Sequence, residues 1–280
     1  MPELPEVETI VQQLSASLVG QRIVATHIGW PGVVATPSPD ALGAALQGRT
    51  IMGVRRRAKF ILIEVPPHVL VVHLRMTGRL LLCDSADPAP TDERYLRAWW
   101  SLASGQTLCF ADLRKFGRLY LVDDPTPLIA HLGPEPLADD LSADRFAALL
   151  RAHRRQLKPL LLDQRFLAGL GNIYTDEALW RAGLHPLTRA DTLTPAQAEA
   201  LWAAIRAALG EAIADGGTTL RDYRNARNEV GGHAPALAVY GRAGAPCPRC
   251  GTPIVRLVVG GRGTHICPVC QPLAPHPEEA

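Results

Sequence analysis

The sequence has few of the features that mark a membrane or secreted protein. None of its apolar runs approaches the roughly 20 residues that a membrane-spanning helix needs. The amino terminus, Met-Pro-Glu-Leu-Pro-Glu, has neither the basic start nor the apolar stretch of a signal peptide. Lysine is scarce, and the net charge of the 280 residues is only +2, so overall charge does not indicate a nucleic-acid partner. We expect a cytoplasmic protein with no membrane partner.

Cysteine is also rare, and its spacing argues against a disulfide framework. Cys83 and Cys109 stand alone, whereas the other four cysteines form the pairs Cys247-Pro-Arg-Cys250 and Cys267-Pro-Val-Cys270. Each pair places two sulfurs on one tight turn, and two such turns complete a tetrahedron that leaves no position for water. The spacing predicts one structural Zn²⁺ ion bound by Cys247, Cys250, Cys267 and Cys270.

Hydrophobic periodicity changes along the chain. Apolar residues at helical spacing predict a helix from Val7 to Leu18, with Gly20 as its stop. From there to about Asp123, short β-type runs separated by Gly, Pro and Asp indicate a β-sandwich or a barrel. The predicted strands are Ile51–Val54, Phe60–Val65, Val69–Leu74, Arg79–Leu82, Arg97–Leu102, Thr107–Ala111 and Arg118–Val122.

After the strands the pattern becomes helical. His131–Leu137 contains two prolines and a glycine and predicts a linker. Helices are expected at Ser142–His153, Asp176–Ala182 and Thr194–Ala214. A β-hairpin with a glycine-rich tip at Gly260–Gly263 is expected between the two cysteine pairs.

Positive charge is concentrated locally. Arginines outnumber acidic residues from Arg221 to Cys270, and the stretch Arg151–Lys158 has no acid at all. Each cluster could be a solvated surface. Arg262 on the hairpin tip could instead present a planar guanidinium to a phosphate. The glycines of residues 168–172 precede a helix, where free backbone N–H groups suit phosphate oxygens, although such turns are common in structural roles.

The amino terminus offers a nucleophile. Methionine before proline is normally removed, which would leave Pro2 with a secondary amine. An α-amino group titrates at about 7.7–8.0, against about 10.4 for lysine, so more of it is unprotonated at neutral pH. When such an amine attacks an aldehyde-level carbon, the resulting iminium remains cationic and accepts electrons. Glu3 and Glu6 lie close enough to transfer protons. The alternative is an exposed terminus with two solvated glutamates.

A series of motifs resembles those of the formamidopyrimidine-DNA glycosylases, bacterial enzymes that excise oxidised purines. The motifs occur in the family's order and cover nearly the whole chain. They are Met1–Glu8, Lys59-Phe60, His73–Gly78, Asp112–Gly117, Gly169–Tyr174, Gly216–Asp222, Val239–Arg242 and the zinc hairpin that closes on Cys270-Gln271.

The resemblance implies a multidomain α+β fold. An N-terminal β-sandwich with a flanking helix would precede a helix–two-turn–helix domain and a β-hairpin zinc finger. The implied boundaries are 1–132 for the catalytic domain, 133–142 for a linker, 143–228 for the helix–two-turn–helix domain, 229–273 for the zinc finger and 274–280 for a tail. The implied partner is double-stranded DNA with oxidised purines or abasic sites, bound by a monomer in the cytoplasm, at the nucleoid.

The resemblance also implies residue roles. Pro2 would attack C1′ of the damaged nucleotide, Glu3 would act as acid and base, and Glu6 would support them. Lys59, His73, Asn172 and Arg262 match residues that grip phosphates around the extruded nucleotide, and Lys59 and Arg262 count among the catalytic groups. Met76, Arg114 and Phe116 match residues that fill the vacated stack and probe the opposite base.

The implied reaction is base excision followed by strand cleavage. The nucleotide is flipped, Pro2 displaces the base through a Schiff base, and β- and δ-elimination then break the strand. Two alternatives remain. The endonuclease VIII branch shares Pro2 and Glu3 but prefers oxidised pyrimidines, although Leu4 and the Asp112–Gly117 motif favour the purine branch. A zinc-ribbon protein that only binds DNA is the other alternative.

This sequence departs from the family pattern at several positions. Arg75 stands where the family usually has glycine, and Leu113 and Lys115 stand where proline and arginine are more usual. The segment Asn225–His233, in the region that covers the flipped base in this family, also differs from the common wording. These differences bear on base preference and leave the expected catalytic groups in place.

Overall fold

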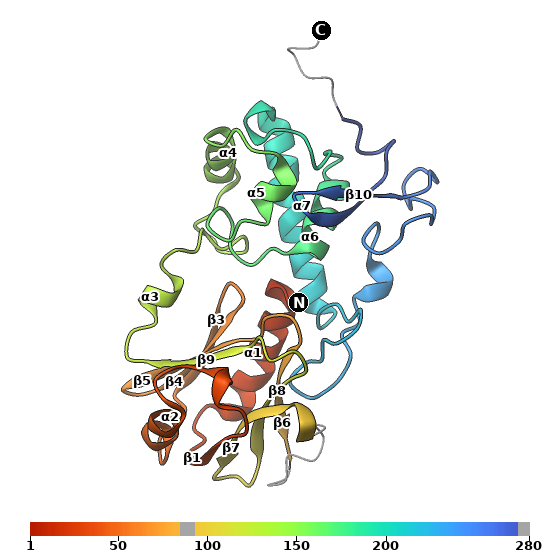
Figure 1. Cartoon of the computed structure of the whole chain (residues 1–280). Helices are drawn as coiled ribbons and strands as arrows, with labels where there is room; N and C mark the ends of the chain where they lie inside the picture. Colours follow the sequence, from red (N-terminus) through yellow and green to blue (C-terminus); the bar gives the residue numbers. More distant parts are fainter. Residues whose placement is uncertain (85–92, 274–280) are drawn as a thin grey trace. The chain divides into compact units, whose positions relative to one another are not determined.

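The computed structural model describes residues 1–84 and 93–273, which form two compact units (Figure 1). The first unit contains Met1–His131 and Ala212–Ala234, and the second contains Leu132–Glu211 and the chain from Pro235 onward. The expected tail, 274–280, lies outside the described residues. No helix within the described ranges has the length and apolar character of a membrane span. The domain boundaries given above stay a prediction.

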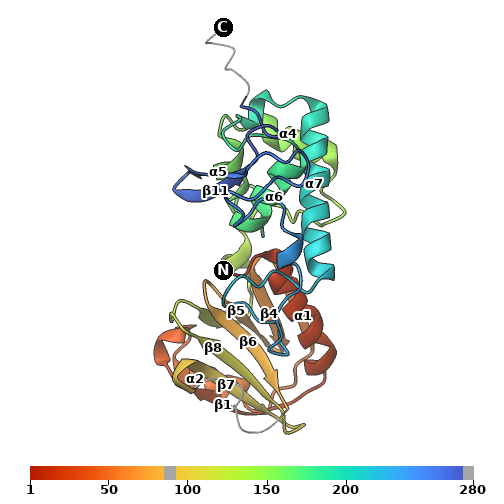
Figure 2. The same ribbon diagram turned by 90° about the vertical axis from the view of Figure 1, so that its right-hand side faces the viewer.

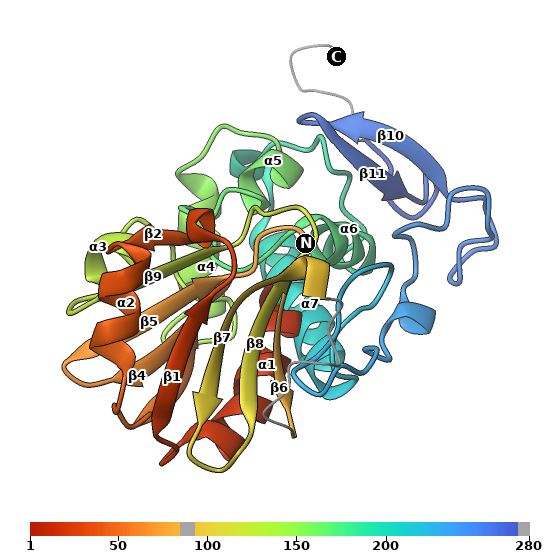
Figure 3. The ribbon, with the colours of Figure 1, turned by 60° about the horizontal axis from the view of Figure 1, so that its bottom comes forward.

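The first unit is built on two β-sheets, which Figures 2 and 3 show from two sides. The four-stranded sheet is antiparallel, in the order β1 (Ile23–Ile28), β7 (Leu96–Leu102), β8 (Thr107–Asp112) and β6 (Gly78–Cys83). The five-stranded sheet has the order β2 (Val34–Thr36), β9 (Arg118–Val122), β5 (His68–His73), β4 (Phe60–Val65) and β3 (Gly53–Arg57), and only β2 and β9 pair in parallel.

The two sheets share one apolar core. Trp100 and Phe110 of the first sheet and Ile61 and Val72 of the second are fully buried in the same cluster. Alternate residues along each strand point into this core, as the period of a β-strand requires. Burial of each such side chain contributes about 1.5–3 kcal/mol. The predicted N-terminal β-domain is thereby confirmed.

Helix α1 (Leu4–Leu18) packs against β3. Its buried face includes Val7, Ile10 and Leu14, at the spacing that predicted it. The helix begins earlier than expected because Glu3, in an extended conformation, serves as its N-cap. The flanking helix thus places the amino terminus at the start of a rigid element.

The second unit is helical and carries the hairpin. Ser142 caps α4 through its hydroxyl, which accepts the N–H of Arg145 at 3.2 Å. The helices are α4 (Ala143–Arg151), α5 (Leu157–Leu161), α6 (Asn172–Arg181) and α7 (Pro195–Ala214), and the hairpin strands are β10 (Val255–Val259) and β11 (Arg262–Ile266). Shorter elements of the two units are α2 (Pro39–Leu46), α3 (Thr126–Ile129) and the 3₁₀ turns Pro31–Val33, Glu93–Tyr95, Ala190–Thr192 and Ala234–Ala236.

Some local expectations were wrong. The strand expected at Ile51–Val54 is displaced toward the C-terminus, to Gly53–Arg57, where it pairs with β4. The hairpin tip is confined to Gly260 and Gly261, whose positive φ angles of 56° and 73° make the turn, so Arg262 begins a strand instead of lying on the tip. The basic stretch Arg151–Lys158 is not a uniformly solvated surface, because Lys158 is fully buried.

Candidate functional site

Two buried carboxylates organise the amino terminus. Glu3 and Glu6 are 3% and 1% exposed and form a capping box, in which each side chain accepts a backbone N–H of the other residue. The Glu3 N–H lies 2.7 Å from Oε2 of Glu6. Pro2, directly before Glu3, is also buried. The candidate nucleophile therefore sits on a backbone fixed by Glu6, and the alternative of a solvated terminus is wrong.

The other oxygen of Glu6 is held by a distant part of the chain. The N–H of Thr218 donates to Oε1 of Glu6 at 2.8 Å. The Tyr223 hydroxyl lies 3.4 Å from the Glu6 carbonyl oxygen, and burial, followed by the Glu6 charge, raises the pKa of this phenol, which keeps it a donor. Gly217 passes so close that an added Cβ would lie 2.9 Å from the Tyr223 ring and 3.2 Å from Cγ of Glu6. This environment was not foreseen from the sequence.

A second group of candidate residues lies on the hairpin of β4 and β5. Phe60 and His73 are paired across the strands, with their rings edge to face at 4.6 Å. Burial lowers the pKa of His73 to about 3, and the charges of Arg75 and Lys59 act in the same direction. His73 is therefore neutral, and its Nδ1 accepts the Arg75 N–H at 3.0 Å. The proton must then be on Nε2, which is suited to donate to a phosphate.

Asp112 joins the two loops that carry Met76, Arg114 and Phe116, the residues expected to fill the vacated stack and probe the opposite base. It is fully buried, and its Oδ1 accepts the Thr77 hydroxyl at 2.5 Å and the Arg114 N–H at 3.1 Å. Its Oδ2 accepts the Gly117 N–H at 2.8 Å. Because Thr77 follows Met76 in one loop and the other donors lie in the second loop, a single carboxylate holds both together. Asp112 was quoted in a motif but given no role in the sequence analysis.

The side chains expected to enter the DNA stack are exposed on these loops. Met76 is 39% exposed and Phe116 is 46% exposed, so both apolar side chains are accessible to a partner. The Arg114 guanidinium lies 4.7 Å from the centre of the Phe116 ring, a cation–π distance. The first unit therefore presents two apolar side chains and one guanidinium from loops that Asp112 ties together.

Arg75 adopts an unfavourable backbone conformation in the same region. Its φ of 54° lies in the left-handed region, which disfavours side chains with a Cβ. We expect Arg75→Gly to raise the free energy of unfolding by about 1 kcal/mol, because relief of this strain exceeds the entropic cost of glycine. The measurement is urea-induced unfolding. Arg55→Gly, in strand β3, is the control and should destabilise; equal losses in both variants would contradict the expectation.

In the second unit, α6 holds the zinc hairpin through buried side chains. Lys158 Nζ lies 2.6 Å from Oδ1 of Asp176 and 3.1 Å from the Gly263 carbonyl, and both side chains are fully buried. The other Asp176 oxygen accepts the His265 N–H at 2.9 Å. Loss of either partner would leave the other charge buried and unpaired, which would destabilise the fold, so the pair of Lys158 and Asp176 has a structural role.

Asn172 is linked to the residue that follows Arg262. Asn172, the first residue of α6, donates from Nδ2 to the Gly263 carbonyl at 2.9 Å. Arg262 is exposed and immediately precedes Gly263 at the start of β11. Its backbone is thus held by the neighbouring carbonyl while its guanidinium reaches solvent. The two expected phosphate contacts of this unit lie on one rigid support.

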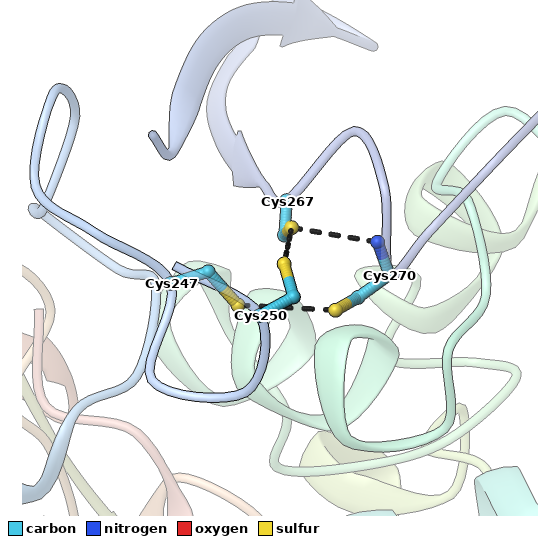
Figure 4. A group of neighbouring side chains, drawn as sticks. All are labelled: Cys247, Cys250, Cys267 and Cys270. Atoms are coloured by element: carbon cyan, nitrogen blue, oxygen red, sulfur yellow. Dashed lines mark hydrogen bonds between the residues drawn. The ribbon is translucent and has the colours of Figure 1, made fainter. Parts of the chain in front are cut away.

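The four paired cysteines form one cluster, drawn in Figure 4. Their sulfurs all lie within 4.8 Å of one another, with Cys247 and Cys270 at 3.9 Å and Cys250 and Cys267 at 3.4 Å. A tetrahedral Zn²⁺ with Zn–S bonds of about 2.3 Å requires sulfurs about 3.8 Å apart. The donor set and spacing fit this ion, which bound there would fasten the hairpin and supply no reactive position.

Each unit thus contains part of the expected site. The first contains Pro2, Glu3, Glu6, Lys59, His73, Met76, Arg114 and Phe116, and the second contains Asn172, Arg262 and the four cysteines. The supporting residues Thr218, Asp112 and Asp176 were not predicted from the sequence. Thr218 and Asp112 lie within quoted motifs, which was the available signal.

Three family models match successive segments of the chain. The Formamidopyrimidine-DNA glycosylase N-terminal domain matches residues 1–119, the Formamidopyrimidine-DNA glycosylase H2TH domain matches 132–224, and the zinc finger found in FPG and IleRS matches 244–273. The zinc-finger match and the cysteine cluster together confirm the prediction of one structural Zn²⁺.

Similar proteins cover the whole length. A formamidopyrimidine-DNA glycosylase of Herpetosiphon aurantiacus is 49% identical over 97% of this chain and 100% of its own. Two structures of the Lactococcus lactis enzyme, one a variant with Fapy-dG-containing DNA and one with abasic-site DNA, are each 38% identical and cover 97% of this chain and 100% of their own, with TM-scores of 0.90 and 0.89. The resemblance seen in the motifs is confirmed, and the chain belongs to the formamidopyrimidine-DNA glycosylase family.

Proposed function

We propose that this DNA glycosylase of base excision repair removes oxidised purines from duplex DNA with the amine of Pro2 as nucleophile, and then cleaves the strand. The observation that carries the proposal is the buried start of the chain, where both oxygens of Glu6 bind backbone N–H groups and so fix Glu3 beside Pro2. The proposal requires that the mature chain start at Pro2. It places the protein in the bacterial cytoplasm, at the nucleoid.

The chemistry follows from the groups on this support. The Pro2 nitrogen forms a bond to C1′ while the bond from C1′ to the base breaks, and the leaving base takes the electron pair and a proton. Opening of the sugar gives a cationic iminium, with Glu3 placed to transfer the protons. Loss of a C2′ proton then expels the 3′ phosphate by β-elimination, and δ-elimination expels the 5′ phosphate. Water finally releases the sugar fragment and regenerates the amine.

Access to C1′ requires the nucleotide to leave the stack. Base flipping costs a few kcal/mol, which apolar wedges offset by occupying the gap. The exposed Met76 and Phe116 are suited to this, and Arg114 beside Phe116 can donate to the orphan base. Neutral His73, buried Lys59 and, in the second unit, Arg262 supply donors for phosphates. Asn172, whose Nδ2 donates to the Gly263 carbonyl and lies 3.4 Å from the Tyr240 hydroxyl, would exchange one of these partners for a phosphate. The DNA bound by the Lactococcus lactis relatives, with Fapy-dG or an abasic site, supports this substrate class.

Duplexes that carry one defined lesion test the proposal. We expect excision of 8-oxoguanine and formamidopyrimidines with a one-nucleotide gap as the final product, and much slower release of thymine glycol. Preference for thymine glycol would favour the endonuclease VIII-like alternative. Binding without product in every duplex would indicate a non-catalytic DNA-binding protein, contrary to the family assignment.

Arg262→Ala provides a test of the phosphate contact. Each phosphate contact to duplex DNA contributes about 0.9 to the slope of log affinity against log salt concentration, because counterions are released. We expect the variant to bind more weakly and its slope to fall by about this amount, as measured by fluorescence anisotropy at several salt concentrations. Arg145→Ala, an exposed arginine of α4 paired with Asp140, should keep the original slope. An unchanged slope in Arg262→Ala would remove this residue from the interface.

A further inference from the structure

The loop after α7 is closed by a side-chain pair at its base. Asp215 directly follows the helix, and His233 lies at the far end of the loop. His233 Nδ1 is 2.8 Å from Oδ2 of Asp215, and since a carboxylate can only accept, Nδ1 carries the proton. The His233 side chain is 2% exposed and that of Asp215 is 49% exposed. At the same ends of the loop, the Gly232 N–H donates to the Asp215 carbonyl at 2.8 Å.

One peptide group connects the closed ends of this loop to the carboxylate of Glu6. The carbonyl of Gly217 accepts the His233 N–H at 3.1 Å, and the N–H of the next residue, Thr218, donates to Oε1 of Glu6 at 2.8 Å. The carbonyl and the N–H belong to the same planar peptide bond, so the direction of one sets the direction of the other. His233 therefore orients the donor that holds Glu6.

The close packing of this segment leaves little room for other arrangements. Gly217 has a φ of 87°, and an added Cβ there would meet the Tyr223 ring at 2.9 Å. An added Cβ on Gly231 would lie 2.2 Å from the Gly217 carbonyl oxygen. The two ends of the loop are thus in contact at glycines. Holding the ends together costs conformational entropy, which specific hydrogen bonds must offset. The Asp215–His233 pair supplies one between side chains.

We propose that Asp215 and His233 are positioning residues for the reaction: their pairing fixes the Gly217–Thr218 peptide, which holds Glu6 and through it the backbone of Glu3. The inference rests on the role of Glu6 in the proposed function. It gives the segment Asn225–His233, whose sequence departs from the family pattern, a part in positioning the catalytic groups. Neither residue touches the DNA in this account.

The test compares variants that break the pair with one that retains it. His233→Phe keeps the ring size and loses the donor, whereas His233→Asn keeps an N–H at nearly the position of Nδ1. Excision is measured with enzyme in excess over an 8-oxoguanine duplex. We expect His233→Phe to slow excision about 10-fold while its DNA affinity stays within about twofold of that of the parent protein. The rate of His233→Asn should lie within about twofold of the parent rate. Asp215→Ala, at a half-exposed position, breaks the same pair should His233→Phe fail to fold.

A double-mutant cycle separates this inference from the proposed function. Leucine cannot accept the N–H groups of Thr218 and Glu3, so Glu6→Leu removes the connection. If the pair acts through Glu6, adding His233→Phe to Glu6→Leu should slow excision by less than about twofold beyond Glu6→Leu alone. Multiplicative losses, or normal excision by both His233→Phe and Asp215→Ala, would overturn the inference while Glu6 keeps its role. Full activity of Glu6→Leu would instead overturn the role of Glu6 and, with it, the inference.

Discussion

Pro2→Gly is expected to lower the rate of base excision by about 100-fold, because the attacking amine is no longer held in place by the proline ring. The variant replaces a rigid secondary amine by a flexible primary amine, and its imine can lose a proton and cease to accept electrons. DNA affinity should stay within about twofold, because no described phosphate-binding residue is altered. Single-turnover excision and equilibrium binding, measured on the same duplex, separate the two effects.

Pro5→Ala is the matched control. Pro5 lies at the beginning of α1, is buried, and has no proposed role in the chemistry. Alanine is well tolerated in a helix, so excision by this variant should remain close to that of the parent protein. Mass spectrometry must show that Met1 is absent in each preparation. An equally fast Pro2→Gly enzyme would contradict the assignment of the nucleophile.

Loss of the zinc ion is expected to weaken DNA binding by about 100-fold or more, since structural zinc supplies about 10–16 kcal/mol to the folding of a small finger. The ion fits the cluster of Cys247, Cys250, Cys267 and Cys270, and the attached hairpin carries Arg262. Without it, the hairpin loses the support that aligns Arg262 with Asn172. Cys267→Ser should release the metal, measured as zinc per chain, and reduce affinity in anisotropy experiments.

Cys83→Ser is the control for thiol chemistry elsewhere. Cys83 lies 3.6 Å from Cys109 on neighbouring strands β6 and β8 of the first unit, and neither is near the cluster in sequence. This variant should retain one zinc ion per chain and bind DNA as before. Loss of zinc with full affinity in Cys267→Ser would mean that the finger does not support the DNA contact, and retention of zinc would contradict the assignment of Cys267 as a ligand.

Patterns of short range predicted much of the fold. Short β-type runs located β4 and β9 at their observed bounds, and the two cysteine pairs identified the zinc site, because both signals depend on neighbouring residues. Helix α2 was missed although Ser38 accepts the Ala41 N–H at 3.3 Å as its cap. Strand β1, Ile23–Ile28, was not located individually, since only part of it is buried.

The supporting residues of the site could not be predicted in the same way. Thr218 acts through its backbone N–H on Glu6, more than 200 positions away, and no side-chain property reveals such a contact. Lys158 belongs to a basic stretch for which a solvated surface was one of two open interpretations, and the structure pairs it with buried Asp176. The motifs supplied Pro2, Glu3 and Glu6, whereas the burial of Glu3 and Glu6 required the three-dimensional arrangement. The reactive groups could thus be predicted from local motifs, whereas the distant residues that hold them in place could not.

Borohydride trapping with an abasic-site duplex tests the central claim most directly. Reduction of the iminium would lock the DNA onto the attacking nitrogen, and mass mapping of the proteolysed adduct would identify the residue. We predict a single adduct on the peptide that begins with Pro2. An adduct on Lys59 or another lysine, or active protein that gives no adduct, would contradict the account.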